Sequence, residues 1–454
     1  MEKTDIEALV KKQRDFFSSG RTLDPDWRRR QLSRLEAAIY VWQPRIEAAL
    51  MEDLGKDATE AWMSEIGMVL QDLRWQKNHL KELARAKAVP TPLVQFWARS
   101  RVIPMPYGNV LVMSPWNYPF LLSMGPLCEA LAAGNTVLLK PGSASVHTSQ
   151  VMADMLGEVF DESYVAVVQG GHQENTDLLR EKFDKIFFTG SMRVGKVVMA
   201  SAAEHLTPVT LELGGKSPAI VDETADIVLS ARRIIWGKEL NGGQTCVAPD
   251  YVLVHESVHD VLVKQLCHEA NVQANPASKI ISQKALDRLK GLAEQEKELG
   301  RVVYGGEVQG RHMDLAIVDG ADWSDPVMES ELFGPILPVI TYSDFDGLME
   351  KLKGMDHPLA FYLFSRDAGH IRTMKFEMPF GGGCVNDTVV QLASDHMPFG
   401  GVGASGMGQY HGKWGFETFT HPKSVLEKGL WIDVPLRYRP YGRWADALIR
   451  RFMR

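Results

Sequence analysis

The sequence predicts an α/β protein in which parallel sheets are covered by helices. Two patterns indicate this class: the first 85 residues repeat apolar side chains at helical spacing, and from residue 109 short β-rich runs alternate with helical segments. Size is a third observation, because 454 residues with 45% hydrophobic and 24% charged side chains suffice for two or three globular domains. We find no internal repeat and no tract of low complexity.

Three helical segments precede the sheets. The second is expected to stop before Pro44, because a proline inside a helix removes a hydrogen bond and clashes with the preceding turn. The stretch VPTPLVQFWARSRVIPMPYG then breaks the pattern, and its middle is expected to form an edge strand or an arm. The helical segments are DIEALVKKQRDFFSSG, DPDWRRRQLSRLEAAIYVWQ and TEAWMSEIGMVLQDLRWQKNHLKELAR.

Two series of strand candidates follow, separated by helical segments. This alternation is typical of parallel sheets with crossover helices, which place ligand loops at the carboxyl ends of the strands. The first series, between residues 109 and 215, is VLVMS, NTVLLK, YVAVVQG, KIFFTG and VTLELGG. The second series is SPAIV, YVLVHES, RVVYGG, ILPVITY and LAFYLFS.

Composition and charge exclude several classes of protein. A net charge of −7 and a pI near 6.0 provide no basic field for a phosphate backbone, so nucleic acid is not expected as a partner. The N-terminus lacks the apolar core of a secretory signal, and prolines and polar residues interrupt the apolar stretch 110–133. We therefore expect a cytoplasmic protein with no membrane span.

The four cysteines are scattered, without CxxC pairs or zinc-ligand spacing, which suits a reducing compartment and predicts no metal site. Cys128 lies in an apolar run, Cys267 in an amphipathic helix and Cys384 in GGGCVND, so these three are expected to fill space. Cys246 differs, because in NGGQTCVAPDY it follows glycines that free the backbone to approach a ligand. It is the candidate nucleophile.

Two further residues have side chains suited to catalysis. Glu212 in VTLELGGKSP stands between leucines at a strand end, where apolar surroundings raise a carboxyl pKa toward that of a general base; a solvent-facing strand glutamate is the alternative. Asn117 in SPWNYPF stands on an aromatic turn after a strand, where its amide is placed to meet an oxyanion, although asparagine is also common in turns.

The stretch DKIFFTGSMRVGKV resembles a phosphate-binding P-loop. Gly190 opens the loop and Gly195 with Lys196 closes it, but residue 197 is Val where P-loop enzymes need a hydroxyl for magnesium. A short loop that begins a helix still offers Ser191 and backbone N–H groups to a pyrophosphate. We expect phosphate contact here and not NTP hydrolysis.

A second glycine pattern, residues 401–406, matches the dinucleotide fingerprint G-x-G-x-x-G. No strand precedes it and no βαβ unit follows it, so the context of a dinucleotide site is missing. We interpret this pattern as a tight loop near the active site or a domain interface.

Taken together and in order, these stretches resemble the aldehyde dehydrogenase superfamily. The matching motifs, between about residues 106 and 424, are PWNYP, LLKP, FTGSMRVG, LELGGKSP, GGQTCVAPDY, ELFGP and MPFGGVGASGMGQYHGKWGFETFTH. CVAPDY and YHGK resemble the class 3 subgroup, which oxidises fatty and aromatic aldehydes. The resemblance implies a Rossmann-like cofactor domain, an α/β catalytic domain and a small oligomerisation element.

The resemblance also implies a mechanism. Cys246 as thiolate attacks the aldehyde carbon, and Asn117 with the Cys246 backbone N–H holds the oxyanion of the thiohemiacetal. Hydride passes to the nicotinamide, and water activated by Glu212 hydrolyses the thioester to a carboxylic acid. No metal is required.

Cofactor residues follow from the same resemblance, which implies NAD or NADP. Lys140 is expected to contact the adenosine ribose, Glu331 and Phe333 to position the nicotinamide ribose and ring, and the loop after KIFFT to bind the pyrophosphate. The full expected set is Trp116, Lys140, Ser143, Gly190, Ser191, Gly195, Glu331 and Phe333.

One position departs from the family pattern. The usual stretch is K-P-S-E, whereas this chain has Lys140-Pro141-Gly142-Ser143. Without the glutamate, no carboxylate is expected to repel a 2′-phosphate, and Lys140 remains to attract one. We therefore predict that NADP is accepted alongside NAD.

The expected domain organisation completes the prediction. Residues 1–85 and 106–208 form the dinucleotide-binding domain, 209–395 the catalytic domain, and 86–105 with 396–454 the oligomerisation element and C-terminal tail. We expect a homodimer. The aromatic, arginine-rich tail LWIDVPLRYRPYGRWADALIRRFMR is expected to serve packing or the dimer surface, with contact to a membrane surface as the alternative.

The expected substrate is an aldehyde, medium-chain aliphatic or aromatic, held in an apolar tunnel that includes Tyr118. His396 and His411 lie near the substrate end and are interpreted as structural. Two other functions are weighed: a nucleotide-binding NTPase, which Val197 disfavours, and a scaffold on an inactive dehydrogenase fold, which the catalytic residues disfavour. Transfer of the thioester to coenzyme A is disfavoured by Glu212.

Overall fold

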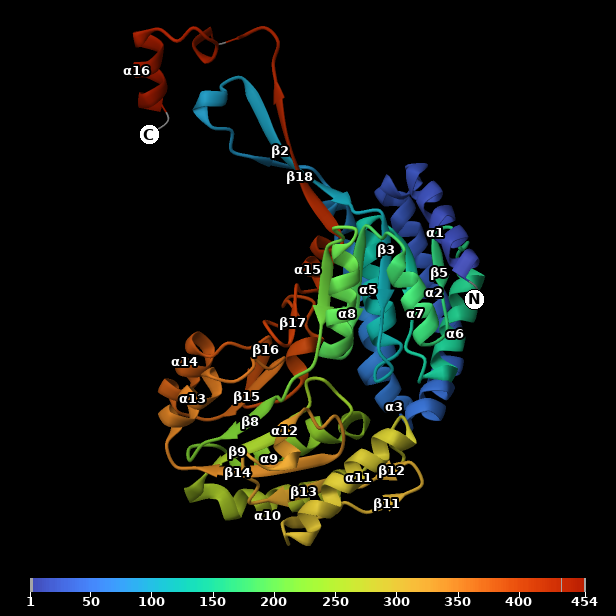
Figure 1. Cartoon of the computed structure of the whole chain (residues 1–454), viewed down its shortest axis with the longest axis vertical. Helices are drawn as coiled ribbons and strands as arrows, with labels where there is room; N and C mark the ends of the chain where they lie inside the picture. The colour runs from blue at the N-terminus through green and yellow to red at the C-terminus, as the bar shows by residue number, and fades with distance from the viewer. Residues whose placement is uncertain (1–2, 434, 453–454) are drawn as a thin grey trace.

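The computed structural model describes residues 3–433 and 435–452; residues 1–2, 434 and 453–454, parts of the expected N-terminal domain and tail, lie outside the described residues. Two α/β units lie one above the other, and an arm of strands projects from the upper unit (Figure 1). The predicted α/β class is confirmed, and all ten strand candidates contain a strand.

The upper unit is built on a six-stranded sheet with the order β17-β7-β6-β3-β4-β5. Neighbours are parallel except β17, which runs antiparallel to β7. The strand order reverses at β3, so the carboxyl ends of β3 and β6 form the kind of switch point at which α/β sheets bind ligands. The strands are β3 (Asn109–Met113), β4 (Thr136–Lys140), β5 (Val165–Val167), β6 (Lys185–Thr189), β7 (Val209–Glu212) and β17 (Gly406–Met407).

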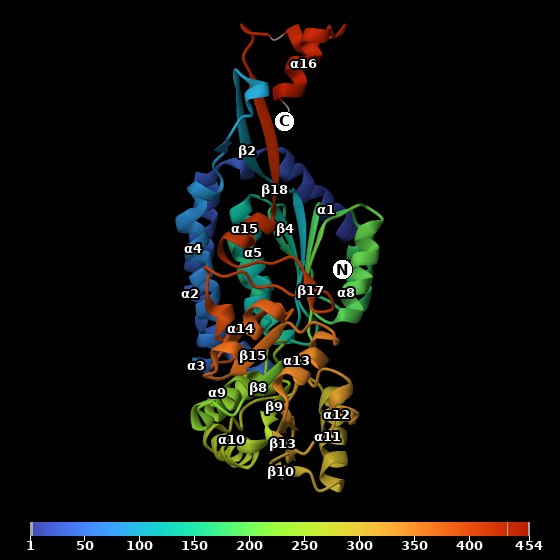
Figure 2. The same cartoon turned by 90° about the vertical axis from the view of Figure 1, so that its left-hand side faces the viewer.

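Helices cover both faces of this sheet, with α2 and α4 on one side and α8 on the other (Figure 2). α2 continues through Pro44, so the expected stop before Pro44 was wrong. Trp42 and Ile46, on either side of the proline, are buried in the core, and this packing outweighs the lost helix hydrogen bond. The helices are α1 (Lys3–Ser18), α2 (Pro25–Leu54), α3 (Ala58–Ala61), α4 (Gly67–Leu83), α5 (Leu121–Ala133), α6 (Val146–Val159), α7 (His172–Arg180), α8 (Met192–Ala203) and α15 (Gly412–Thr418).

The lower unit contains a seven-stranded sheet with the order β10-β13-β14-β9-β8-β15-β16. β13 and β16 were not predicted; β16 begins with two glycines, which are depleted in strands. The strands are β8 (Pro218–Val221), β9 (Tyr251–His255), β10 (Val302–Tyr304), β13 (Ala316–Asp319), β14 (Ile336–Tyr342), β15 (Ala360–Phe364) and β16 (Gly382–Val385), with a separate ribbon β11 (Val308–Gln309) and β12 (His312–Met313). The helices are α9 (Ile227–Glu239), α10 (His259–Gln273), α11 (Gln283–Glu298), α12 (Pro326–Glu329), α13 (Phe345–Lys353) and α14 (Ala368–Glu377).

The stretch predicted as an edge strand or arm forms an arm. β1 (Lys87–Val89), β2 (Ala98–Pro106) and β18 (Thr420–Lys428) make an antiparallel sheet that projects from the upper unit toward α16 (Arg443–Phe452) (Figures 1 and 2). Across the base of the tail, the Trp97 and Trp431 rings meet edge to face with centroids 4.5 Å apart. Within the described part of the chain, each helix is too short or too polar to cross a bilayer.

Candidate active site

The parallel strands β3, β4, β6 and β7 have their carboxyl ends on the same side of the upper sheet. Lys140 is the last residue of β4 and pairs with Met113 at the end of β3, while Glu212 ends β7 opposite Thr189 of β6. Asn117 follows β3 in the chain. Since the strands are parallel and in register, their following loops gather at this edge, as expected for a ligand site.

The Cys246 loop owes its shape to three left-handed residues. Asn241, Gly242 and Gly243 have φ values of 53°, 59° and 72°, a conformation that glycine adopts readily and asparagine tolerates. A Cβ on Gly243 would also lie 2.5 Å from the Gly334 carbonyl oxygen, so no larger residue fits there. This turn places Cys246 in the same cavity wall as Thr189 and Glu212, the last residues of β6 and β7.

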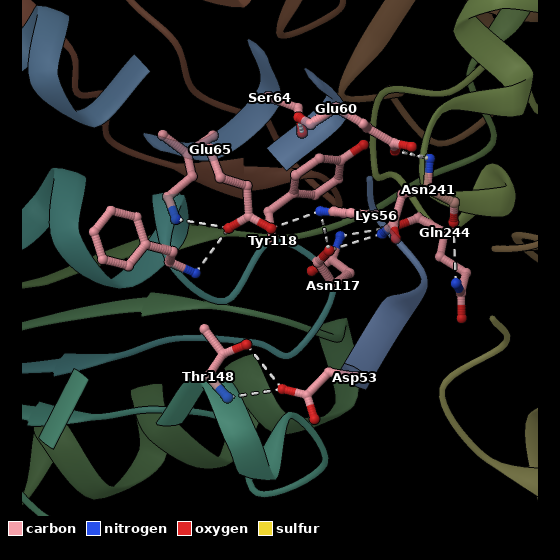
Figure 3. Close-up of polar contacts among 12 residues, drawn as sticks. Asp53, Lys56, Glu60, Ser64, Glu65, Asn117, Tyr118, Thr148, Asn241 and Gln244 are labelled. Carbon is pink, nitrogen blue, oxygen red and sulfur yellow. Dashed lines mark hydrogen bonds and ion pairs between the residues drawn. The ribbon is translucent and has the colours of Figure 1, made fainter. Parts of the chain in front are cut away.

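Asn117 is tied to the same loop (Figure 3). Its Nδ2 donates to the Gln244 carbonyl at 3.0 Å, and its own carbonyl accepts from Asn241 Nδ2 at 2.7 Å. The next residue, Tyr118, makes a hydroxyl contact of 2.7 Å with Thr245. The amide predicted for oxyanion binding is therefore fixed within two residues of Cys246.

Glu212 is 1% exposed, and neither carboxylate oxygen has a hydrogen-bond partner of normal geometry among the described residues. Burial raises the pKa of Glu212 well above its ordinary value, opposed by the nearby backbone N–H of Gly401. The Gly190 N–H donates to the Glu212 carbonyl at 2.9 Å, and Gly406 pairs with Glu212 across β17. The 401–406 loop thus lies at the general-base candidate, as the sequence predicted.

Cys246 is a partly buried thiol. Burial, then the Glu331 and Glu212 carboxyls, raise its pKa to about 12. The thiol is therefore protonated at neutral pH in this state, and it needs a neighbouring base or a bound ligand to become the thiolate.

Cys246 and Glu212 line one cavity of about 280 Å³. Most of the wall is apolar, so a hydrocarbon chain or ring can fill it while both reactive side chains face the same space. Tyr118 and His411 also line it. The other apolar wall residues are Met63, Met68, Leu121, Leu122, Leu213, Trp236, Leu240, Val247, Leu359, Val389, Val390, Leu392, Ala393, Phe399 and Tyr410.

The expected nicotinamide residues lie together. Phe333 adopts a left-handed φ of 49°, and its ring meets the Trp116 ring edge to face at 5.5 Å. Glu331 Oε1 is buried and has no hydrogen-bond partner among the described residues, which suits a ligand hydroxyl. A Cβ on Gly214 would lie 2.1 Å from Glu331 Oε2, so this glycine lets the carboxylate approach the backbone.

The expected pyrophosphate loop begins α8. Ser191 is the N-cap residue of this 12-residue helix and accepts from the Val194 N–H at 3.4 Å, and the other N–H groups of the first turn point out of the helix end. Gly190 and Gly195 pack closely, because an added Cβ would lie 2.7 Å from the tip of the Phe188 ring and 2.8 Å from a methyl group of Leu213 respectively. These residues fit a dinucleotide.

Between Lys140 and Ser143, the backbone at Gly142 lies close to the backbone at Trp116, since a Cβ on Gly142 would lie 2.9 Å from the Trp116 nitrogen. Ser143 is exposed, whereas Lys140 is buried and donates to the Gly170 carbonyl at 2.8 Å. Burial lowers the pKa of Lys140 to about 8.

No carboxylate stands at position 143, but the carboxylate of Glu174, which sequence analysis did not consider, acts on Lys140. The Glu174 carboxylate opposes the lowering of the Lys140 pKa, and its Oε2 accepts from the Gly171 N–H at 2.7 Å. Glu174 caps α7, and no local pattern in the sequence indicates that it lies near Lys140.

Two histidines interpreted as structural differ in position. His396 is exposed, while His411 is a cavity wall residue whose backbone N–H donates to Glu129 Oε1 at 2.8 Å. Burial lowers the pKa of His411 to about 4, so its ring is neutral at pH 7. Among residues 3–433 and 435–452, we find no group of three or more His, Cys, Asp or Glu placed to hold a metal ion.

Sequence analysis missed most of the cavity wall. Met63 and Met68 come from the N-terminal helices, Trp236 from α9 and Val390 from the turn η6 (Val390–Ala393). These side chains are ordinary apolar residues of helices and turns, and no local pattern distinguishes them from core residues.

Comparison with known proteins agrees with this geometry. Residues 1–425 match the aldehyde dehydrogenase family. The chain is 42% identical to the Staphylococcus aureus 4,4'-diaponeurosporen-aldehyde dehydrogenase, with 96% of each chain covered, and 39% identical to mouse aldehyde dehydrogenase family 3 member A2, covering 98% of this chain and 95% of the relative. Its fold matches a substrate-bound structure of S. aureus AldH with a TM-score of 0.96, at 41% identity and 99% coverage of both chains.

The predicted resemblance, including its class 3 character, is therefore confirmed. The chain belongs to the aldehyde dehydrogenase family and is an oxidoreductase that converts aldehydes to carboxylic acids with NAD or NADP.

Proposed function

We propose that Cys246 is the nucleophile, Asn117 the oxyanion donor and Glu212 the general base of this oxidation. The observation that carries the proposal is the shared cavity, in which Cys246 and Glu212 face one apolar space and Asn117 is bonded to the Cys246 loop. The buried, unpaired Glu212 carboxylate supports the role of a base that binds a water molecule.

The first half of the reaction forms a bond at sulfur. The Cys246 thiol gives its proton to solvent water, and the thiolate Sγ attacks the aldehyde carbon, which turns the carbonyl oxygen into an oxyanion. Asn117 Nδ2 and the Cys246 backbone N–H donate to this oxygen. When bound, NAD or NADP supplies the nicotinamide that accepts hydride from the substrate carbon, which leaves a thioester on Cys246.

The second half is hydrolysis. Glu212 takes a proton from water, the hydroxide adds to the thioester carbon, and the C–S bond breaks. The carboxylic acid leaves and Cys246 returns as the thiolate.

The residues proposed to hold the dinucleotide are Trp116, Lys140, Ser143, Gly190, Ser191, Gly195, Glu331 and Phe333.

We propose medium-chain aliphatic and aromatic aldehydes as substrates, because the cavity is apolar and of moderate volume. The test follows absorbance at 340 nm with hexanal and benzaldehyde, using NAD and NADP in parallel. Reduction of the cofactor with either aldehyde is expected, and a carboxylic acid product distinguishes hydrolysis from transfer to coenzyme A. A preference for short polar aldehydes over both would contradict the proposed class.

Cofactor preference is expected to depend on Ser143. Replacing Ser143 with glutamate places a carboxylate where none stands now, and we expect the KM for NADP to rise by about 10-fold relative to that for NAD. Glu174→Gln keeps the hydrogen bond to Gly171 and removes a charge, so it should lower the KM for NADP. The measurement is initial rate against each cofactor.

Ala144→Glu is the matched control, because Ala144 is the exposed neighbour of Ser143. It should change the NADP to NAD ratio much less than Ser143→Glu. A strong preference for NAD that Ser143→Glu leaves unchanged would show that Ser143 does not set cofactor choice.

We also propose that the protein is a cytoplasmic homodimer. Residues 1–85 and 106–208 form its dinucleotide-binding domain and 209–395 its catalytic domain. Residues 86–105 with 396–454 form the oligomerisation element and tail. Support for the dimer comes from large apolar side chains exposed on the arm and tail, namely Leu93, Phe96, Trp97, Leu430 and Trp431. Four free cysteines suit a reducing compartment. Light scattering should give twice the chain mass of 50.7 kDa.

A further inference from the structure

A buried ion pair lies directly behind the turn that carries Asn117. Lys56 lies between α2 and α3, Glu65 lies on the π-helical segment η2 (Trp62–Ile66), and Lys56 Nζ lies 2.6 Å from Glu65 Oε1. Their side chains are only 1% and 0% exposed. Because two buried charges lose their hydration, such a pair is weak evidence for stability, and its contacts call for another explanation.

The cation binds the backbone of Asn117. Lys56 Nζ donates to the Asn117 carbonyl at 3.1 Å and lies 3.6 Å from the centre of the Tyr118 ring (Figure 3). Asn241 Nδ2 donates to the same carbonyl. Lys56 thus contacts the residue proposed to bind the oxyanion and the aromatic residue after it.

The anion binds the other end of the turn. Glu65 Oε2 accepts from the backbone N–H groups of Phe120, at 2.8 Å, and Leu121, at 3.0 Å, where α5 begins. Burial raises the pKa of the Glu65 carboxyl, whereas the Lys56 ammonium and the two backbone N–H groups oppose that rise and favour the carboxylate, as a helix N-terminus also does. The ion pair therefore holds both ends of the segment 117–121.

We propose that Lys56, held in place by Glu65, is a positioning residue for aldehyde oxidation: it fixes the turn so that the Asn117 amide faces the oxygen of the substrate bound at Cys246. The inference rests on the oxyanion role proposed above for Asn117. The segment between β3 and α5 has no strand or helix of its own at Asn117, so its side-chain contacts set its geometry. A displacement of about 1 Å in such a site lowers a rate on the order of 10²-fold.

The test is a double-mutant cycle on turnover. The variant Lys56→Met with Glu65→Gln replaces the pair by neutral side chains of similar size, and the glutamine oxygen still accepts from the N–H groups at the start of α5. We expect kcat to fall by about 10- to 100-fold while the KM for the aldehyde changes by less than about 2-fold. In an Asn117→Ala background the same pair of changes should cost no further activity, because Lys56 acts through Asn117.

Two further measurements separate positioning from loss of structure. The melting temperature should stay close to that of the wild type, because neutral side chains of similar size can replace a buried ion pair with little change in stability. The rate at which iodoacetamide alkylates Cys246 should also match the wild type, because alkylation uses no oxyanion donor. Lys185→Met is the matched control: Lys185 is also a buried lysine, but it lies at the amino end of β6, away from the site, and its loss should leave kcat unchanged. If the neutral pair does not fold, Lys56→Arg keeps a cation beside Glu65 but moves the donor away from the Asn117 carbonyl, and the same fall in kcat, absent in the Asn117→Ala background, is expected.

The outcomes separate this inference from the proposed function. Equal losses of kcat with and without Asn117, or a wild-type kcat in the neutral-pair variant, would overturn the role of Lys56 while leaving the oxyanion role of Asn117 intact. A wild-type kcat for Asn117→Ala alone would overturn both. A loss that disappears in the Asn117→Ala background is the result that supports the inference.

Discussion

Replacing Cys246 with alanine is expected to abolish NAD(P)-dependent aldehyde oxidation, with a fall in kcat on the order of 10⁴-fold or more. The physical reason is that no other cysteine among the described residues lines the cavity with Glu212, so no thiolate remains to form the thiohemiacetal. Initial rates at 340 nm with a saturating aldehyde measure the effect. Dinucleotide binding and melting temperature should stay close to those of the wild type.

Cys267→Ala is the matched control for this experiment. Cys267 lies on α10 and is half-buried, outside the wall of the cavity, so its loss should leave the rate unchanged. Turnover above about 1% of the wild-type value in Cys246→Ala would show that the oxidation does not proceed through a covalent bond to this cysteine.

Replacing Glu212 with glutamine should separate the two halves of the reaction. The glutamine cannot take a proton from water, so hydrolysis slows by about 10²- to 10⁴-fold while thioester formation continues. Rapid mixing should show a burst at 340 nm of about one equivalent per active site, followed by slow turnover. Mass spectrometry of the quenched protein should find the acyl group on Cys246.

The same variant tests how the thiol loses its proton. Glu212 contributes to the raised pKa of Cys246, after burial and Glu331, so its removal should lower that pKa and move the pH dependence of Cys246 alkylation to lower pH. A shift to higher pH would mean that Glu212 itself accepts the thiol proton. Glu296→Gln, at a buried glutamate of α11 outside the cavity wall, controls for the loss of a buried carboxyl group.

Much of the fold could be predicted from local patterns. The strands of both series are short apolar runs rich in β-branched residues, and their alternation with helical segments is enough to indicate parallel sheets. Pro44 shows the limit of local rules, because the burial of Trp42 and Ile46 keeps α2 helical where the backbone alone favours a stop. β16 was missed because two glycines begin it.

The candidate site also has residues with a local sequence signal and residues without one. Cys246 and Asn117 could be selected as candidates because each stands in a distinctive local context, a glycine-rich loop and a rigid turn after a strand. Glu174 was missed although it stands near Lys140, because 34 positions of sequence separate the two residues and only the pairing of β4 with β5 brings their loops together.

The sequence by itself determined the α/β class, the family and the candidate residues of the active site, because strand and helix periodicity, glycine turns and reactive side chains are properties of short segments. Only the tertiary structure decided which carboxylates lie near Lys140 and Cys246 and which apolar side chains form the cavity wall. It also placed Lys56 and Glu65 in hydrogen-bond contact with the two ends of the segment 117–121. Those features depend on contacts between segments far apart in the chain, and burial then sets the pKa values and the strength of each contact.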